Sequence, residues 1–143
     1  MIYTDKPADF RNNLDVSGCF VESDGEILLL QRQDHKSEPN TWGVPGGKKN
    51  PHESIEEAMV REMREETGCS IHPKDLKFFK TVFVHYDAFD VSYHIFHLTT
   101  IKRPDISINP HEHKAYMWQT PARALTMTLM QDEDACIKLF YNL

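Results

Sequence analysis

The chain has 143 residues, of which 40% are hydrophobic and 27% charged, a size and composition typical of one globular domain. Its 22 acidic and 16 basic residues give a net charge of −6, which argues against general nucleic-acid binding and against a basic membrane-surface protein, since both need clustered positive charge. The 3 cysteines form no Cys-x-x-Cys pair, no secretory signal opens the sequence and no apolar run has membrane-spanning length, so we expect a cytoplasmic protein.

The first predicted elements are two strands joined by a tight turn. Val16–Glu22 and Glu26–Gln33 flank Ser23–Gly25, where an Asp-Gly pair supplies the positive φ angles that a hairpin turn requires. A short segment, Thr41–Val44, leads into Pro45–Gly47, whose proline and two glycines predict a turn that exposes its backbone to a ligand. We therefore expect a β-hairpin followed by a glycine-rich turn.

One long helix is predicted near the middle of the chain. Ser54–Thr67 has helical periodicity, and Gly68 follows it at the position where a glycine commonly ends a helix. The next two segments, Leu76–Tyr86 and Val91–Ile101, are rich in β-branched and aromatic residues, which favours two paired strands.

The last third of the chain is predicted to add one strand and two helices. Lys114–Gln119 is the strand candidate, Pro121–Leu125 a short helix and Asp132–Tyr141 the C-terminal helix. Strands on either side of a central helix, with a terminal helix, predict a mixed α/β architecture in a single domain that spans residues 1–143.

The predicted central helix carries carboxylates along its apolar stripe. At about 100° per residue, Glu65 and Glu66 lie about 60° and about 40° on either side of Glu62, in an arc that also holds Ile55 and Met59. Unpaired like charges at this spacing repel each other, and three hard oxygen ligands suit Mg²⁺ or Mn²⁺. The alternative is a solvated, salt-bridged helix face. We favour the metal site because a solvated face should lie opposite the apolar stripe.

The glycine-rich turn and this helix together match one long pattern. Gly-x5-Glu-x7-Arg-Glu-U-x-Glu-Glu-x-Gly-U, in which U is apolar, is the signature box of the Nudix hydrolases. Every fixed position is present, with a cysteine where Ile, Leu or Val is usual at the last one: Gly47, Glu53, Arg61, Glu62, Met63, Glu65, Glu66, Gly68 and Cys69. The chain resembles this family across residues 47–69, which we expect to form a loop–helix–loop.

Two further segments extend the resemblance. Trp42 ahead of Pro45–Gly47 is similar to the segment that commonly leads into the box, and Glu112 and His113 followed by Trp118 resemble a Glu-His-x4-Trp stretch of the family. In relatives that glutamate lies on a loop over the metal site, so His113 is expected beside it. The implied fold is an α/β/α sandwich around a mixed β-sheet, in agreement with the predicted elements.

The resemblance implies an activity and a metal site. Family members hydrolyse a phosphoanhydride bond in a nucleoside diphosphate-linked substrate with a divalent cation, here expected to be Mg²⁺ or alternatively Mn²⁺. The implied ligands are Glu62, Glu65, Glu66 and the Gly46 carbonyl. Either Glu62 or Glu112 is implied as the general base, because the family varies at this step.

Other box residues are implied to support the site. Arg61 is expected to orient a box glutamate, with Glu53 as the partner in a pair of parallel hydrogen bonds. Gly47 and Gly68 are expected to shape the backbone on either side of the helix.

The substrate contacts are predicted from residue type and position. Arg32 and Lys48 are candidates for phosphate binding, with solvated surface side chains as the alternative. Trp42 and Tyr86 are candidates for stacking on a base, although strand aromatics commonly pack in a core. Tyr86 lies at about the distance from the box at which relatives acting on dinucleoside polyphosphates carry a tyrosine. A nucleoside triphosphate, a nucleotide sugar or a dinucleoside polyphosphate stays open as the substrate.

Two other functions compete with hydrolysis. One is a non-catalytic nucleotide-sensing module on the same fold, which would be expected to have lost box carboxylates, and the other is an acidic interaction domain. All three helix glutamates are present, which favours an enzyme with a small-molecule nucleotide substrate. Many relatives are dimers, so the resemblance also raises a homodimer.

Overall fold

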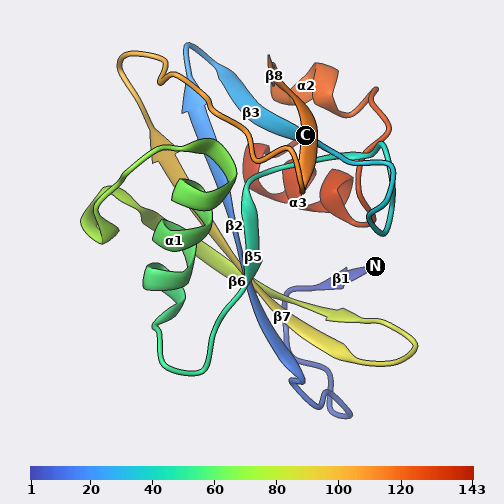
Figure 1. Cartoon of the computed structure of the whole chain (residues 1–143). Coiled ribbons are helices and arrows are strands. Elements are labelled where there is room, and N and C mark those ends of the chain that lie inside the picture. Colours follow the sequence, from blue (N-terminus) through green and yellow to red (C-terminus); the bar gives the residue numbers. More distant parts are fainter.

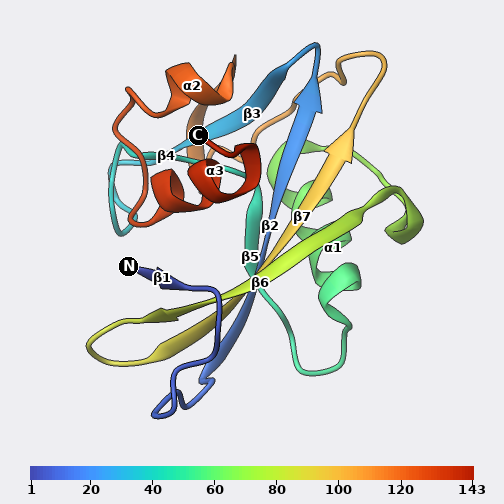
Figure 2. The ribbon, with the colours of Figure 1, turned by 180° about the vertical axis from the view of Figure 1, so that it is seen from behind.

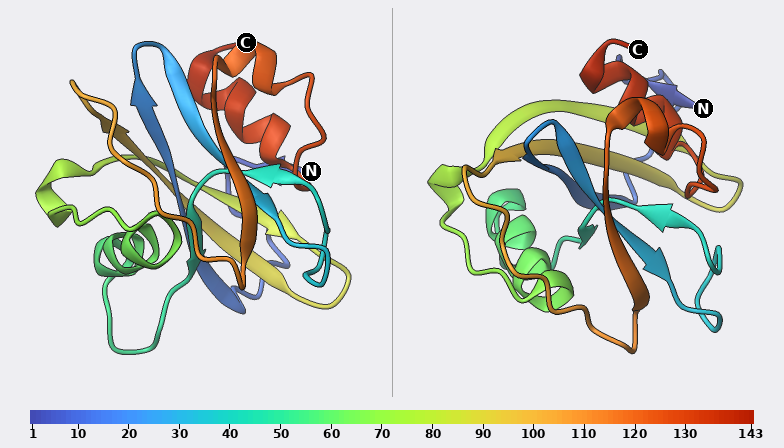
Figure 3. Two further views of the ribbon diagram at one scale, coloured as in Figure 1. Left: turned by 45° about the horizontal axis from the view of Figure 1, so that its top comes forward. Right: turned by 90° about the horizontal axis from the view of Figure 1, so that it is seen from above.

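A mixed sheet stands between two layers of helices. The computed structural model describes all 143 residues, and helix α1 (Ile55–Thr67) covers one face of the sheet while α2 (Pro121–Ala124) and α3 (Glu133–Tyr141) cover the other (Figures 1 and 3). The strands are β1 (Ile2–Tyr3), β2 (Leu14–Ser23), β3 (Glu26–Arg32), β4 (Trp42–Gly43), β5 (Gly46–Lys48), β6 (Lys77–His85), β7 (Asp90–Thr99) and β8 (His113–Gln119), and Pro73–Asp75 form a short 3-10 helix, η1. The predicted α/β/α sandwich in a single domain is confirmed.

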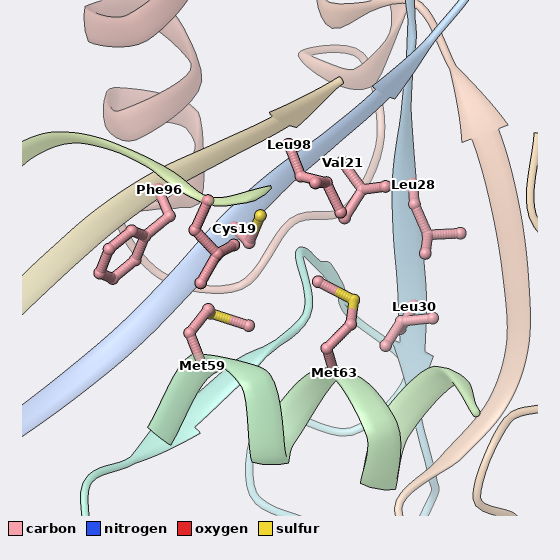
Figure 4. Packing of buried hydrophobic residues seen from close by; sticks show 9 residues of the cluster. Cys19, Val21, Leu28, Leu30, Met59, Met63, Phe96 and Leu98 are labelled. Carbon is pink, nitrogen blue, oxygen red and sulfur yellow. The ribbon is translucent and has the colours of Figure 1, made fainter. Parts of the chain in front are cut away.

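Alternation along the central strands builds a core on each side of the sheet. In β2, Cys19 and Val21 face α1, whereas Phe20 faces α3 together with Ile137. Figure 4 shows the side chains of α1 pointing up into the first of these cores. The buried residues of that core are Cys19, Val21, Leu28, Leu30, Met59, Met63, Leu76, Phe96 and Leu98.

The sheet divides where β5 joins it. The strand order is β1-β6-β7-β2-β3-β4, with β8 added beside β3, and β2 runs parallel to β7 but antiparallel to β3 and β5. Val16–Gly18 pair with β5, while Glu22 and Ser23 at the other end of β2 pair with β3. In the view from behind, β5 lies where β3 diverges from β2 (Figure 2). The backbone of β5 therefore occupies the junction between the two halves of the sheet.

The predicted hairpin is confirmed, but the glycine-rich turn is not a turn. Asp24 and Gly25 have φ angles of 52° and 75°, as the hairpin requires. Gly46–Lys48 instead form strand β5, so the box opens in a strand rather than in a loop. The glycines serve close approach, because a Cβ atom at Gly46 would lie 2.0 Å from the carbonyl oxygen of Ser17.

Helix α1 ends at the predicted residue and begins one residue after the predicted start, because Ser54 caps it. The Ser54 hydroxyl accepts the amide hydrogen of Glu57, whose carboxylate accepts that of Ser54, so two free amides are satisfied. Gly68 takes the left-handed conformation, with φ of 76°, and donates its amide to the carbonyl of Arg64. These caps fix the orientation of the acidic segment between them.

The remaining elements agree with the predictions at nearly the same bounds. Strands β6, β7 and β8 and helices α2 and α3 lie where the sequence places them, whereas β1 and η1 are too short to leave a periodic pattern. None of the helices combines the length and the hydrophobicity that a membrane span requires.

Candidate active site

The buried face of α1 is rotated from the arc predicted for it. Met59 and Met63 lie at its centre, and Glu66 is buried beside them. Glu62 lies at the margin with 15% of its side chain exposed, while Glu65 is 50% exposed. The prediction that all three carboxylates face the core is therefore wrong for Glu65, which stands about 120° from Met59 around the helix.

Glu66 connects α1 to the sheet. Its Oε1 accepts the amide hydrogen of Gly46 at 2.7 Å, and its Oε2 lies 3.7 Å from Nε2 of His113. Burial, reinforced by the charges of Glu62 and Glu112, raises the pKa of Glu66 well above its usual value. Burial lowers the pKa of His113 to about 4, so this imidazole is neutral near pH 7 and does not compensate the charge of Glu66.

Arg61 holds the acidic helix against β5. Its Nη2 and Nε donate to the two oxygens of Glu53 at 2.7 and 3.1 Å, which confirms the predicted pairing, and this guanidinium lowers the pKa of Glu53 to about 2. Nη1 donates to Glu62 at 2.9 Å and to Glu65 at 3.3 Å, and Nη2 donates to the carbonyl of Lys48 at 2.9 Å. Arg61 thereby sets the position of Glu62 relative to the strand.

Gly47 leaves the space that the Glu62 carboxylate occupies. A Cβ atom at Gly47 would lie 2.4 Å from Oε1 of Glu62, well inside contact distance. Glu66 accepts a hydrogen bond from the amide of Gly46, and Glu62 lies against Gly47. The carboxylates of Glu62 and Glu66 therefore both lie directly beside the backbone of β5.

Glu112 faces the same region from the loop before β8. It is 41% exposed, and its Oε2 lies 3.0 Å from Nζ of Lys36, which belongs to the loop between β3 and β4. The two loops are also joined by Gln33, whose side chain donates to the carbonyl of Pro110 at 2.9 Å. These contacts hold a carboxylate and an ammonium group over the carboxylates of α1.

These elements enclose a cleft of about 640 Å³ with no hydrophobic lining. The cleft brings together the predicted site residues Glu62, Glu65, Glu66 and Glu112 and the predicted basic residues Arg32 and Lys48. The lining residues are Arg32, His35, Lys36, Ser37, Gly46, Gly47, Lys48, Glu62, Glu65, Glu66, Asn109 and Glu112.

An apolar pocket of about 400 Å³ adjoins this cleft between the sheet and the start of α3. Tyr86, a candidate for a base contact, lines this pocket and packs against Phe89 with ring centroids 5.2 Å apart. Trp42 lines neither cavity, because it packs on the α3-side core next to Leu129. The two cavities share a lining at β5 formed by Arg32, Gly46, Gly47, Lys48 and Glu66.

Three site residues were missed by the sequence predictions. Lys36 lines the polar cleft, and Tyr93 and Glu133 line the apolar pocket. None of them belongs to a local motif, and each reaches its cavity only through the packing of a distant segment. Lys36 lies in the loop between β3 and β4, and Glu133 is the first residue of α3. Tyr93 is one of several aromatic residues in β7, so the sequence does not distinguish it.

The carboxylates fit a divalent cation in chemistry but are not arranged around one as they stand. No group of three His, Cys, Asp or Glu side chains has metal-binding geometry, since Arg61 draws Glu65 and Glu62 toward itself. Glu62 and Glu66 nevertheless place two partly or fully buried carboxyls side by side, and burial raises the pKa of each. Hard oxygen donors fit Mg²⁺ or Mn²⁺, and Glu65, which is half exposed and bound to Arg61 at 3.3 Å, lies on the same side of the helix.

Comparison with known proteins agrees with the fold and the motif. The family model of the NUDIX domain matches residues 11–140. The chain is 33% identical over 132 residues to the CTP pyrophosphohydrolase of Escherichia coli strain K12, a match that covers 91% of this chain and 93% of that protein. Its structure is similar to the MutT protein from Methanosarcina mazei Go1, with a TM-score of 0.80, 25% identity and coverage of 95% and 97% of the two chains. It is also similar to the E. coli ORF135 protein, with a TM-score of 0.74, 25% identity and coverage of 97% and 95%.

Proposed function

The chain belongs to the Nudix hydrolase family, and from this premise we propose that it hydrolyses nucleoside triphosphates at a phosphoanhydride bond with Mg²⁺ as the divalent cation. The observation that carries the proposal is the junction of two cavities of opposite character at β5. The polar cleft suits a polyphosphate and a cation, and the adjoining apolar pocket has the volume of a small-ligand site. A nucleotide that spans the junction places its phosphates in the cleft and its base in the pocket.

The cation would be held by oxygen ligands from α1 and β5. Glu62, Glu65 and Glu66 would be its carboxylate ligands and the Gly46 carbonyl its neutral ligand. Such a cation would neutralise phosphate oxygens and lower the pKa of a water molecule. Oxygen donors of this kind favour Mg²⁺ and accept Mn²⁺.

The basic residues of the cleft bind the phosphates. Nε of Arg32 donates to the carbonyl of Ser37 at 2.6 Å and its Nη2 to the hydroxyl at 2.9 Å, so its guanidinium is held in place before a ligand arrives. Lys48 lies at the junction of the two cavities, and Lys36 lies at the outer wall of the cleft. Phosphate oxygens that attract Lys36 draw it away from Glu112 and release that carboxylate.

Glu62 and Glu112 are the two candidates for the group that takes the proton of the attacking water. Replacement of the base by glutamine lowers kcat by about 10²- to 10⁴-fold with little change in the Mg²⁺ concentration required. Replacement of a metal ligand raises that concentration. Mg²⁺ titrations of Glu62→Gln and Glu112→Gln therefore assign the two roles.

Nucleoside triphosphates are the proposed substrate class because the full-length relative from E. coli is a CTP pyrophosphohydrolase. The proposed products are a nucleoside monophosphate and pyrophosphate. Nucleotide sugars and dinucleoside polyphosphates offer the same bond with a second group on the terminal phosphate, so they belong in the same assay.

The experiment incubates the purified protein with nucleoside triphosphates, nucleotide sugars and dinucleoside polyphosphates in Mg²⁺ and separates the products by chromatography. We expect a triphosphate to be the preferred substrate and Glu66→Gln to reduce its turnover by at least about 100-fold while remaining folded. Glu56→Gln makes the same change on the first turn of α1, away from the cleft, and should keep wild-type turnover. Nucleotide binding without any product, or full turnover in Glu66→Gln, would contradict the proposal.

A further inference from the structure

A tight turn before β8 places Glu112 at the polar cleft. Its sequence, Asn109-Pro110-His111-Glu112, has an asparagine and a proline where turns favour them. The main-chain carbonyl of Asn109 accepts the amide hydrogens of Glu112 at 3.0 Å and of His113 at 2.9 Å. The side chain adds a third bond, because Oδ1 of Asn109 accepts the amide hydrogen of His111 at 3.0 Å. Both oxygens of Asn109 therefore hold the turn.

The same turn is bound to the loop between β3 and β4. The side chain of Gln33 donates to the carbonyl of Pro110 at 2.9 Å, and Nε2 of His35 donates to the carbonyl of His111 at 3.0 Å. The turn is thus held by a neighbouring loop as well as by its own bonds. The direction of the Asn109 amide is fixed too, because only its oxygen can accept the amide hydrogen of His111. Nδ2 therefore occupies the other branch of the side chain.

The amide nitrogen of Asn109 has no partner in the protein. Oδ1 makes the only hydrogen bond of this side chain, and Nδ2 donates to none of the carboxylates of the cleft. Asn109 lines the polar cleft together with Glu112 but does not line the apolar pocket. Its two amide hydrogens are therefore free to bind a ligand in the part of the cleft that lies away from the junction at β5.

The charges around Asn109 favour a phosphate as that ligand. From the loop before β8 only Asn109 and Glu112 line the cleft, and Glu112 is already paired with Lys36 at 3.0 Å. A phosphate on this side of the cleft meets a carboxylate and needs a hydrogen-bond donor. The amide supplies two N–H groups without a positive charge, so it would not repel a divalent cation held by the carboxylates of α1.

We propose that Asn109 is a further substrate-binding residue, whose Nδ2 donates to the second or third phosphate of a nucleoside triphosphate. This role rests on the function proposed for the site. A triphosphate with its first phosphate at the junction extends the other two into the cleft, which Asn109 lines. A nucleoside monophosphate ends at the junction and does not reach this residue. Asn109 therefore contributes to the affinity for triphosphates and not to the affinity for monophosphates.

The test measures binding of CMP and of a CTP analogue with a methylene group in place of the oxygen between its first and second phosphates. Titration calorimetry in Mg²⁺ compares the wild type with Asn109→Asp and Asn109→Ser, which both keep an oxygen for the amide hydrogen of His111 but have no amide donor. Each variant should bind the analogue at least about tenfold more weakly, because a donor to a charged oxygen is lost. Both should bind CMP within about twofold of wild type. Asn142→Asp makes the same change at an exposed position that lines neither cavity, and it should match wild type.

Three results overturn the role of Asn109. Unchanged affinity for the analogue in both variants means that the amide stays in water, and an equal loss of affinity for CMP means that the turn itself has changed. A loss confined to Asn109→Asp means that the new charge repels the phosphates and that no donor is missing.

The measurement also separates this role from the proposed function, because neither CMP nor the analogue has a cleavable bond between a first and a second phosphate. Binding of the analogue that depends on Asn109, in a protein that hydrolyses no triphosphate, overturns the proposed function alone. Triphosphate hydrolysis with unchanged affinity for the analogue in both variants overturns the role of Asn109 alone. Absence of any nucleotide binding overturns both.

Discussion

The raised carboxyl pKa values in this protein have burial as their main cause. Glu62 and Glu66 are partly or fully buried next to each other and to Glu112, so burial and like charge both favour their protonated forms, and Arg61 opposes this effect at Glu62. Glu133 is fully buried near Asp134 and Glu38, and burial again has the larger effect and like charge the smaller. Carboxyls on both sides of β5 therefore lie in surroundings that disfavour their charged forms.

Glu133 makes stability depend on pH in a predictable direction. Its pKa rises from an ordinary 4.5 to about 7 on folding, so the unfolded chain loses this proton first as the pH rises. The free energy of unfolding therefore falls between pH 4.5 and pH 7, by about 3 kcal/mol for this group. Glu133→Gln has no proton to lose, so its Tm relative to wild type should increase from pH 5 to pH 8. Parallel curves for the two proteins would contradict this, and Glu56→Gln, on the first turn of α1, is the control that should follow wild type.

At the scale of elements, α1 and β5 work as one unit. The caps fix where α1 begins and ends, Arg61 ties it to the carbonyl of Lys48, and Glu66 accepts the amide of Gly46. The helix and the strand are also joined by the contact of Glu62 with Gly47. Small changes in β5 should therefore move the carboxylates.

The two glycines of β5 should respond differently to alanine. A Cβ atom at Gly46 meets the backbone of Ser17 at 2.0 Å, which cannot yield without moving β2, so Gly46→Ala should destabilise the protein by about 3 kcal/mol or more. A Cβ atom at Gly47 meets the flexible carboxylate of Glu62 at 2.4 Å, so Gly47→Ala should cost about 1 kcal/mol or less and lower kcat by about 100-fold. Chemical denaturation and kinetics of both variants check this. Equal stability losses, or wild-type kcat in Gly47→Ala, would show that the two contacts do not differ in this way.

Local patterns account for the elements that the sequence predicted correctly. The caps at Ser54 and Gly68 and the Asp-Gly hairpin turn depend on neighbouring residues, so they are legible without a structure. The exposure of Glu65 is not local, because it depends on how α1 rotates as Met59 and Met63 pack beneath β2 and β3. Including Met63 with Met59 in the apolar stripe predicts a buried face that is turned away from Glu65.

The parts of the site that could not be predicted are contacts between distant segments. Lys36 meets Glu112 only because the loops before β4 and β8 are joined, and Glu133 meets Val44 only because α3 packs over the start of β5. Pro-Gly-Gly favours a turn locally, whereas pairing with β2 decides the conformation of the glycines in β5. Packing between distant segments therefore decides the conformation of β5 and the contacts of Lys36 and Glu133, which local sequence preference does not determine.

For the whole molecule, the placement of charge matters more than its sum. A net charge of −6 opposes a polyphosphate, yet Arg32, Lys36 and Lys48 line the cleft that also holds the carboxylates. The divalent cation proposed for this site would reverse the local sign where Glu62 and Glu66 lie. The division of the sheet at β5 brings the basic, acidic and apolar linings to one junction.

Mg²⁺ should therefore stabilise the entire fold. A ligand that binds only the folded state adds RT ln(1 + [L]/Kd), or about 2.7 kcal/mol at a hundredfold excess over Kd, and here it also relieves repulsion between the carboxylates of α1. We expect the Tm of the wild type to rise by about 9 °C in saturating Mg²⁺ compared with NaCl of equal ionic strength. Glu66→Gln should lose most of this rise, and Glu56→Gln, changed on the same helix but away from the cleft, should keep it. A rise of the same size in NaCl, or in Glu66→Gln, would mean that the stabilisation comes from general charge screening and not from the carboxylates beside β5.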